Sequence, residues 1–234
     1  MLYKLKDRIR RARFANQCGA VLESDPVLLD QSSQLALLSQ LQHKDVLMFL
    51  LAVQSFAVQV RPRAVFVLDD GSLTGADRQI LRRQIPDVSF FALEDYRNSL
   101  CPRGGCWERL LAIASLVKDY YVVQLDSDTL TVGAIEEVQD CISRNSSFAL
   151  ATWDNQRLEM MVERCETAQK LISTARAHVQ LWAEANFDKL ADYQTLRYVR
   201  GCAGFAGFAR HSFEIEFVEG GAMTVVLPAN RSCL

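Results

Sequence analysis

Two carboxylates separated by one residue, Asp126 and Asp128, follow a run of aromatic and apolar residues that ends at Leu125. Because the run Tyr120–Leu125 is rich in aromatic and β-branched residues, it predicts a buried strand with the pair at its C-terminal end. Ligands of open α/β sheets bind at that edge. Neighbouring carboxylates repel each other unless a cation lies between them, and oxygen ligands suit a hard divalent ion. The spacing therefore indicates a metal–diphosphate site, although an acidic turn after a strand explains the same residues without a ligand.

A second acidic cluster, Asp69-Asp70-Gly71-Ser72, follows the apolar run Ala64–Leu68. Carboxylates at a strand end accept hydrogen bonds from a ribose or a base, and a Gly-Ser turn lets the backbone approach a ligand closely. An Asp-Gly turn followed by helix capping at Thr74 is the alternative that needs no ligand. Since both clusters end a predicted strand, we expect them at the same edge of one sheet.

The elements that must position these clusters alternate along the chain. Strands are predicted at 35–38, 64–68, 88–91, 120–125 and 148–151, and helices at 43–58, 74–84, 107–117 and 159–187. Strands separated by helices predict right-handed βαβ units and a mainly parallel sheet with helices on both faces. The sequence shows no internal repeat or linker, so we expect a single α/β domain over residues 1–234.

Four segments in this order resemble the nucleotide-diphospho-sugar transferases, the glycosyltransferases of the GT-A fold, and in particular their bacterial members. The segments are 65–74 (VFVLDDGSLT), 107–110 (WERL), 123–130 (VQLDSDTL) and 201–208 (GCAGFAGF). The resemblance implies a GT-A-like, Rossmann-like fold. It also implies that the chain transfers a sugar from a nucleotide-diphosphate donor to an acceptor that the sequence does not identify.

By this resemblance, Asp128 and Asp126 hold Mn²⁺ or Mg²⁺ against the diphosphate of a UDP- or GDP-sugar. The metal would offset the charge on the departing nucleoside diphosphate. Asp69 or Asp70, with the turn at Gly71 and Ser72, would contact the nucleoside.

The resemblance assigns three further residues to the donor site. Arg109 would reach the donor or brace the carboxylates, and its alternative is a cation on the surface of a helix. Gly204 and Gly207 would form a small-residue loop under the donor sugar, whereas packing of small residues is their alternative. No catalytic residue can be named. The histidines, His43, His178 and His211, are isolated in sequence and are expected on the surface or in packing.

The resemblance stops after the glycine-containing segment. Members of the fold carry a Trp/Glu-containing acceptor segment and often a late metal-binding His there, and residues 213–234 show neither. We therefore expect a C-terminal part that is incomplete, and a nucleotide-sugar-binding remnant with impaired catalysis is an alternative function. A phosphatase of the haloacid dehalogenase type is a further alternative. That class places its D-x-D on the first strand and expects Thr or Val where Leu130 stands.

The composition limits which binding partners and which cellular location are expected. A net charge of −2 and a pI near 6.0 give no general attraction to nucleic acid. The seven cysteines are scattered and odd in number, which fits reduced thiols in the cytoplasm. No apolar stretch approaches the roughly 20 residues that span a bilayer. The basic segment at about 1–14 predicts a solvated first helix, with weak association with a membrane surface as the alternative.

Overall fold

The computed structural model describes residues 6, 10, 13–14, 17–172 and 179–221. The predicted basic helix at 1–14 and the tail beyond residue 221 lie almost wholly outside this part of the chain. By their internal contacts the residues form two compact units. Unit 1 comprises Met1–Asp95, Leu116–Phe148 and Gly204–Ser212, and unit 2 comprises Tyr96–Ser115, Ala149–Ala203 and Phe213–Leu234. One functional domain over 1–234 stays a prediction.

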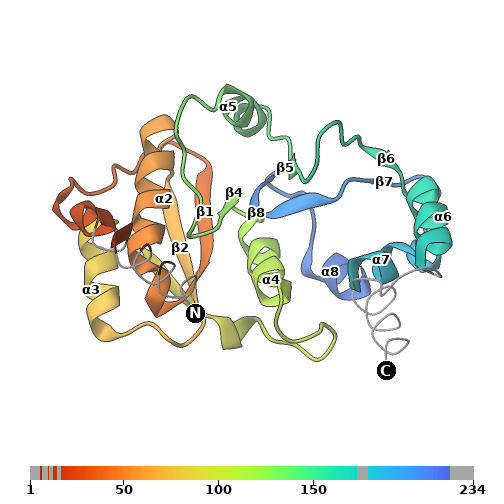
Figure 1. The fold of residues 1–234 in the computed structure, drawn as a ribbon, viewed down its shortest axis with the longest axis horizontal. Coiled ribbons are helices and arrows are strands. Elements are labelled where there is room, and N and C mark those ends of the chain that lie inside the picture. Colours follow the sequence, from red (N-terminus) through yellow and green to blue (C-terminus); the bar gives the residue numbers. More distant parts are fainter. Residues whose placement is uncertain (1–5, 7–9, 11–12, 15–16, 173–178, 222–234) are drawn as a thin grey trace. The chain divides into compact units, whose positions relative to one another are not determined.

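A six-stranded sheet has the strand order β3-β2-β1-β4-β8-β5 (Figure 1). Its strands are β1 (Leu35–Leu41), β2 (Ala64–Asp69), β3 (Ser89–Ala92), β4 (Tyr121–Leu125), β5 (Phe148–Ala151) and β8 (Gly201–Phe208). The pairs β1–β2, β1–β4 and β2–β3 are parallel, whereas β8 runs antiparallel to β4. The predicted α/β class with a mainly parallel sheet is confirmed.

Helices connect and flank the strands. They are α2 (Val46–Gln59), α3 (Gly75–Gln84), α4 (Trp107–Leu116), α5 (Glu136–Ser143), α6 (Met161–Ile172), α7 (Val179–Glu184) and α8 (Ile215–Gly221). Short 3₁₀ helices are η1 (Gly19–Glu23), η2 (His43–Asp45), η3 (Leu93–Tyr96) and η4 (Phe187–Lys189). Of the described residues, no helix is long and apolar enough to cross a membrane. The expected cytoplasmic location stays a prediction.

The single helix predicted over 159–187 is wrong. The segment begins in a strand, β6 (Glu159–Met160), continues in α6 and α7, and ends in η4; residues 173–178 lie outside the described part. Strand β6 pairs antiparallel with β7 (Arg197–Tyr198), a partner almost forty residues away. Local apolar spacing carries no information about such a pairing.

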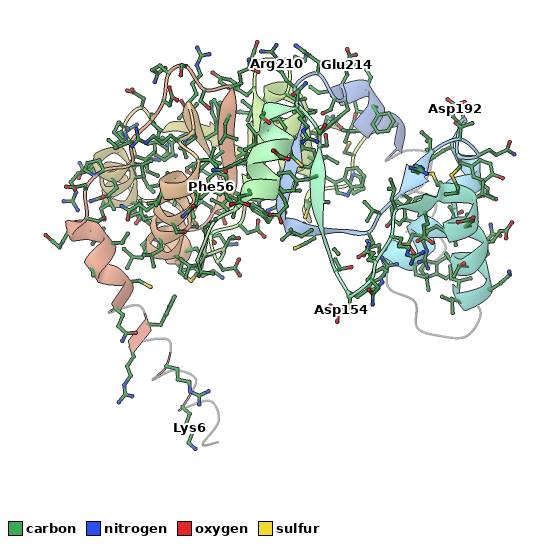
Figure 2. The ribbon with its side chains drawn as sticks, turned by 90° about the horizontal axis from the view of Figure 1, so that it is seen from above. Lys6, Phe56, Asp154, Asp192, Arg210 and Glu214 are labelled. Atoms are coloured by element: carbon green, nitrogen blue, oxygen red, sulfur yellow. The ribbon has the colours of Figure 1, made fainter. Side chains whose placement is uncertain are left out.

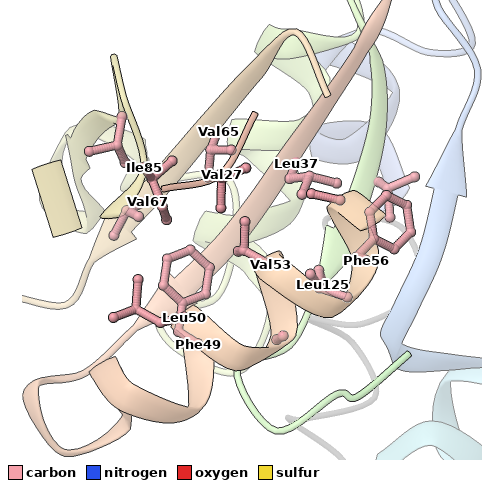
Figure 3. Packing of buried hydrophobic residues seen from close by; sticks show 14 of the residues in the cluster. Val27, Leu37, Phe49, Leu50, Val53, Phe56, Val65, Val67, Ile85 and Leu125 are labelled. Carbon is pink, nitrogen blue, oxygen red and sulfur yellow. The ribbon is translucent and has the colours of Figure 1, made fainter. Parts of the chain in front are cut away.

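The core of unit 1 forms between the sheet and α2 (Figure 3). Leu37 of β1 and Val65 of β2 belong to this core with Phe49 and Val53 of α2, and all four are buried. Side chains alternate between the faces of a strand, so every second residue of β1 and β2 enters this core. This packing fixes the position of β2, and the Asp69–Ser72 cluster lies at the C-terminal end of that strand.

Two smaller apolar clusters lie among the described residues of unit 2. One joins Leu111 and Ala114 of α4 to Val218 of α8. The other joins Met161 and Cys165 of α6 to Phe187 of η4, with Tyr198 packed against it. Phe187 and Tyr198 meet edge to face, with ring centroids 4.9 Å apart.

Candidate functional site

The paired carboxylates lie at the C-terminal end of β4, in unit 1. The strand ends at Leu125, and the chain turns at once, because the N–H of Thr129 donates to the carbonyl oxygen of Asp126 at 3.1 Å. Asp126 is half-buried and Asp128 is exposed. The pair therefore occupies a turn on the edge of the sheet, with Asp128 accessible to a ligand.

The start of this turn is held from both neighbouring strands. On one side, the buried hydroxyl of Ser39 in β1 donates to the carbonyl oxygen of Leu125. On the other side, the N–H of Asp126 donates to the carbonyl oxygen of Gly204 in β8 at 2.8 Å. Because both strands belong to the sheet, the position at which the carboxylates begin is set by rigid elements.

The turn also lies at the topological switch point of the sheet. Strand β1 has β2 on one side and β4 on the other, and all three run parallel. Where the strand order reverses in this way, a crevice opens outside the carboxyl ends of the strands, and ligands of open α/β sheets bind there. Asp126 and Asp128 follow β4 at this point, and the Asp69–Ser72 cluster follows β2 across β1.

The carboxylate of Asp69 stabilises the loop that follows it. Asp69 is 5% exposed. Oδ1 accepts hydrogen bonds from the N–H of Gly71 at 2.8 Å and of Leu73 at 3.3 Å, and Oδ2 pairs with Arg78. A carboxylate engaged on both oxygens has a structural role. Of the two residues predicted to contact a nucleoside, Asp69 is therefore the less available.

Asp70 is the exposed carboxylate of the cluster. Its Oδ1 accepts from the N–H of Ser72 at 3.0 Å and from the hydroxyl of Ser72 at 2.6 Å. Gly71 between them has φ +94°, a conformation that side-chain-bearing residues rarely adopt. The turn thus presents one exposed carboxylate with a fixed orientation at the edge of the sheet.

His43 and Asp77 form a pair that the sequence did not indicate. The N–H of His43, just after β1, donates to the Ser72 hydroxyl at 2.9 Å, so the loops after β1 and β2 are joined. The Nδ1 atom of His43 lies 2.7 Å from Oδ2 of buried Asp77. Burial is the largest influence on the pKa of Asp77, and by itself it raises this pKa. The hydrogen bonds from Thr74 and His43 outweigh it and leave the pKa below its ordinary value.

Asp77 also completes the start of α3. The Thr74 hydroxyl accepts from the N–H of Asp77, and the Asp77 carboxylate accepts from the N–H of Thr74 at 2.7 Å. This is a reciprocal capping box. The ligand-free explanation given for Thr74 is therefore correct for that residue, while Asp70 remains exposed beside it.

Arg109 belongs to unit 2, on α4. It is 7% exposed, so the alternative of a cation on the helix surface is wrong. Its Nη2 atom donates to the carbonyl oxygen of Ala203 and to Cys106 Sγ, both at 3.2 Å. The guanidinium thus fixes the start of β8 to α4 within unit 2, and its predicted role toward the donor stays a prediction.

The segment with Gly204 and Gly207 is a strand, β8, and the expectation of a loop there is wrong. A Cβ atom on Gly207 would lie 2.2 Å from Phe148 Cε1 and 2.6 Å from the Tyr121 hydroxyl. The packing alternative therefore explains Gly207, which pairs with Val123 inside the sheet. Gly204 lies within the same strand, one residue beyond the part of β8 that pairs with β4, and its carbonyl oxygen accepts from the N–H of Asp126.

The donor atoms of the turn fit a hard divalent cation. Carboxylate oxygens are the ligands that Mg²⁺ and Mn²⁺ prefer, and Mg²⁺ sites commonly use one or two carboxylates together with substrate phosphates and water. Within residues 17–172 and 179–221 no group of three His, Cys, Asp or Glu side chains is placed to hold a metal. A cation here would thus take its remaining ligands from a bound diphosphate and water.

No family model and no curated protein matches the chain. Among solved structures it is similar to the mannosyltransferase Ktr4p from S. cerevisiae, with 11% identity, 94% of this chain and 74% of that chain covered, and a TM-score of 0.46. It is also similar to core-mannan synthase A from Aspergillus fumigatus in its Mn/GDP form, with 9% identity, coverage of 88% and 70%, and a TM-score of 0.43.

A third similar structure is the galactosyltransferase LgtC in complex with donor and acceptor sugar analogues. Its identity is 15%, 83% of this chain and 70% of that chain are covered, and the TM-score is 0.39. Because the identities and TM-scores are this low, the function has to be argued from this chain's own residues.

Proposed function

We propose that this chain binds a UDP- or GDP-sugar together with Mn²⁺ or Mg²⁺ and acts as a glycosyltransferase. The observation that supports this function is the D-x-D turn at the switch point of the sheet. Asp128 is exposed there, directly after β4, and Asp70 is exposed on the loop after β2. Two acidic loops on either side of β1 match a ligand with a diphosphate at one end and a nucleoside at the other.

Each acidic residue has a role that follows from its position. Asp126 and Asp128 supply oxygen ligands for the cation, and Asp70 accepts hydrogen bonds from the nucleoside. When bound, the cation neutralises charge on the departing nucleoside diphosphate. Ser39 and Gly204 hold the start of the turn, so little rearrangement is needed when the ligand arrives.

Calorimetric titration of UDP and GDP with and without Mn²⁺ tests the proposal. We expect binding that depends on Mn²⁺, and we expect Asp128→Asn to weaken it by about a hundredfold, the upper range for residues that support a metal. Asp119→Asn is the matched control, because Asp119 is an exposed carboxylate just before the other end of β4. Equal affinity of wild type and Asp128→Asn would contradict the proposal.

A protein that binds a nucleotide-sugar without transferring the sugar is the second candidate. It needs the same exposed carboxylates for the nucleotide-sugar, Asp70 and Asp128, but no residue that activates an acceptor. Hydrolysis and transfer assays with UDP- and GDP-sugars in Mn²⁺ separate the two functions. Metal-dependent binding without turnover of any donor would select the binding protein.

A further inference from the structure

Unit 2 contains a buried ionic network that the proposed site does not use. Glu184, at the end of α7, is fully buried. Its Oε1 atom accepts from Nε of Arg200 at 2.9 Å and from the Tyr198 hydroxyl at 2.8 Å, and Nη2 of Arg200 also donates to Oε2 at 2.6 Å. Arg164 forms a further ion pair with Glu184, at 3.3 Å. The guanidinium of Arg200 is therefore fixed in orientation.

The loop after β5 is fastened to Arg200. The Gln156 side chain donates to the backbone carbonyl of Arg200 at 2.7 Å and accepts from the N–H of Thr152 at the same distance. Asp154 lies at the turn of this loop (Figure 2). These bonds hold Trp153 beside Arg200, whose guanidinium carbon is 5.7 Å from the centroid of the indole ring.

Trp153 remains 46% exposed in this arrangement. Tryptophan is enriched among the residues that dominate binding at protein surfaces, because the indole offers a large apolar face together with a polar N–H. The residues on either side of Trp153 in the loop are polar, namely Thr152, Asp154, Asn155 and Gln156, while Leu150 and Leu158 before and after them are exposed. A ring with one apolar face and hydroxyls at its edge fits an indole with polar groups directly beside it.

We propose that Trp153 and Arg200 form a carbohydrate-binding subsite in unit 2. The C–H face of a pyranose ring stacks on the indole face that Arg200 leaves open, and the fixed guanidinium holds the indole in place from its other face. Because Glu184 holds Arg200 before the sugar binds, less side-chain entropy is lost on binding. The assignment of this sugar as the acceptor rests on the proposed function, whereas the binding of the sugar does not.

Titrations with methyl pyranosides test the subsite. The probes are both anomers of the gluco, galacto, manno and fuco methyl glycosides, and binding is followed by saturation-transfer NMR and calorimetry. We expect at least one glycoside to bind wild type, Trp153→Ala to weaken it about tenfold or more, and Trp153→Phe to retain part of the affinity. Leu171→Ala is the matched control, since Leu171 is an apolar side chain of unit 2 with 47% exposure.

The outcomes separate this proposal from the proposed function. Mn²⁺-dependent GDP and UDP affinity should be the same in Trp153→Ala as in wild type. If no nucleotide binds while a glycoside binds through Trp153, the nucleotide-sugar function fails and the subsite stands. The subsite is overturned if no glycoside binds, if Trp153→Ala binds them equally well, or if Trp153 supports nucleotide binding or self-association instead.

Discussion

The hydroxyl of Ser39 donates a hydrogen bond to the carbonyl oxygen of Leu125, the last residue of β4 before the paired carboxylates. Ser39 is 1% exposed and lies inside β1, the strand at the switch point. A single buried side chain thus ties the end of β4 to the strand on which the proposed site is centred. Removal of the Ser39 hydroxyl should therefore weaken ligand binding at the site, although the hydrogen bond itself contributes little to the free energy of unfolding.

Ser39→Ala tests this relationship. The variant leaves the Leu125 carbonyl without its side-chain donor, so we expect a loss of about 1 kcal/mol in the free energy of unfolding. We also expect several-fold weaker Mn²⁺-dependent nucleotide binding, because the turn at Asp126 loses one of its two fixed neighbours. Urea unfolding and calorimetry measure the two effects. Ser143→Ala, which removes an exposed hydroxyl bonded within α5, should change neither; equal behaviour of both variants would contradict the positioning role.

Substitutions of Asp69 and Asp70 should have different effects, the first on stability and the second on nucleotide binding. Asp69→Asn weakens the pair with Arg78 and disturbs a carboxylate that is buried, so we expect the free energy of unfolding to fall by about 2 kcal/mol. Asp70→Asn keeps an oxygen for the Ser72 turn and lies at the surface, so stability should stay within about 0.5 kcal/mol. Nucleoside diphosphate binding should nevertheless weaken in Asp70→Asn. The assignment of Asp70 to the nucleoside fails if this affinity is unchanged.

Gly207→Ala should destabilise unit 1 because the new methyl group meets Phe148 and Tyr121. Overpacking of this kind costs about 1–3 kcal/mol. Gly75→Ala, at the first residue of α3, meets nothing within 4 Å and should be neutral or stabilising by up to about 1 kcal/mol. Thermal and urea unfolding of the two variants provide the comparison. A Gly207→Ala protein as stable as wild type would show that Gly207 is not required by packing.

Gly207 also shows where the sequence stops being informative. Strands β2 and β4 were predictable because their apolar runs are continuous and end in Asp, Gly and Ser. Strand β8 was not, since glycine and alanine are depleted in strands and give no alternating pattern. Its place beside β4 depends on how Gly207 fits under Phe148, which is a property of the folded chain.

The candidate site likewise has features that the sequence predicts and features that it does not. The ends of parallel strands are predictable, so the D-x-D turn and the Asp69–Ser72 loop were expected at one edge. The bonds from Ser39 to Leu125 and from His43 to Asp77 join residues 86 and 34 positions apart. The spacing of residues along the sequence does not predict hydrogen bonds between such distant positions. The different availability of Asp69 and Asp70 likewise depends on Arg78, whose contact with Asp69 exists only once α3 has formed.

The pH dependence of stability should report on Asp77. Burial is the largest influence on this carboxyl and raises its pKa, but the hydrogen bonds from Thr74 and His43 bring the net pKa below 3.8. A folded-state pKa below the unfolded value means that the ionised form stabilises the fold. This contribution is complete above the unfolded pKa of about 3.9 and is lost as the pH falls through the folded pKa.

Asp77→Asn should therefore cost about 1 kcal/mol at pH 7, the scale of a helix cap, with a smaller difference from wild type below pH 4. Urea unfolding at pH 7, 5, 4 and 3 measures the two curves. Asp119→Asn, at an exposed position, serves as the control and should track wild type across the range. A gap between wild type and Asp77→Asn that stays constant down to pH 3 would mean that the capping box, and not the charge of Asp77, secures the start of α3.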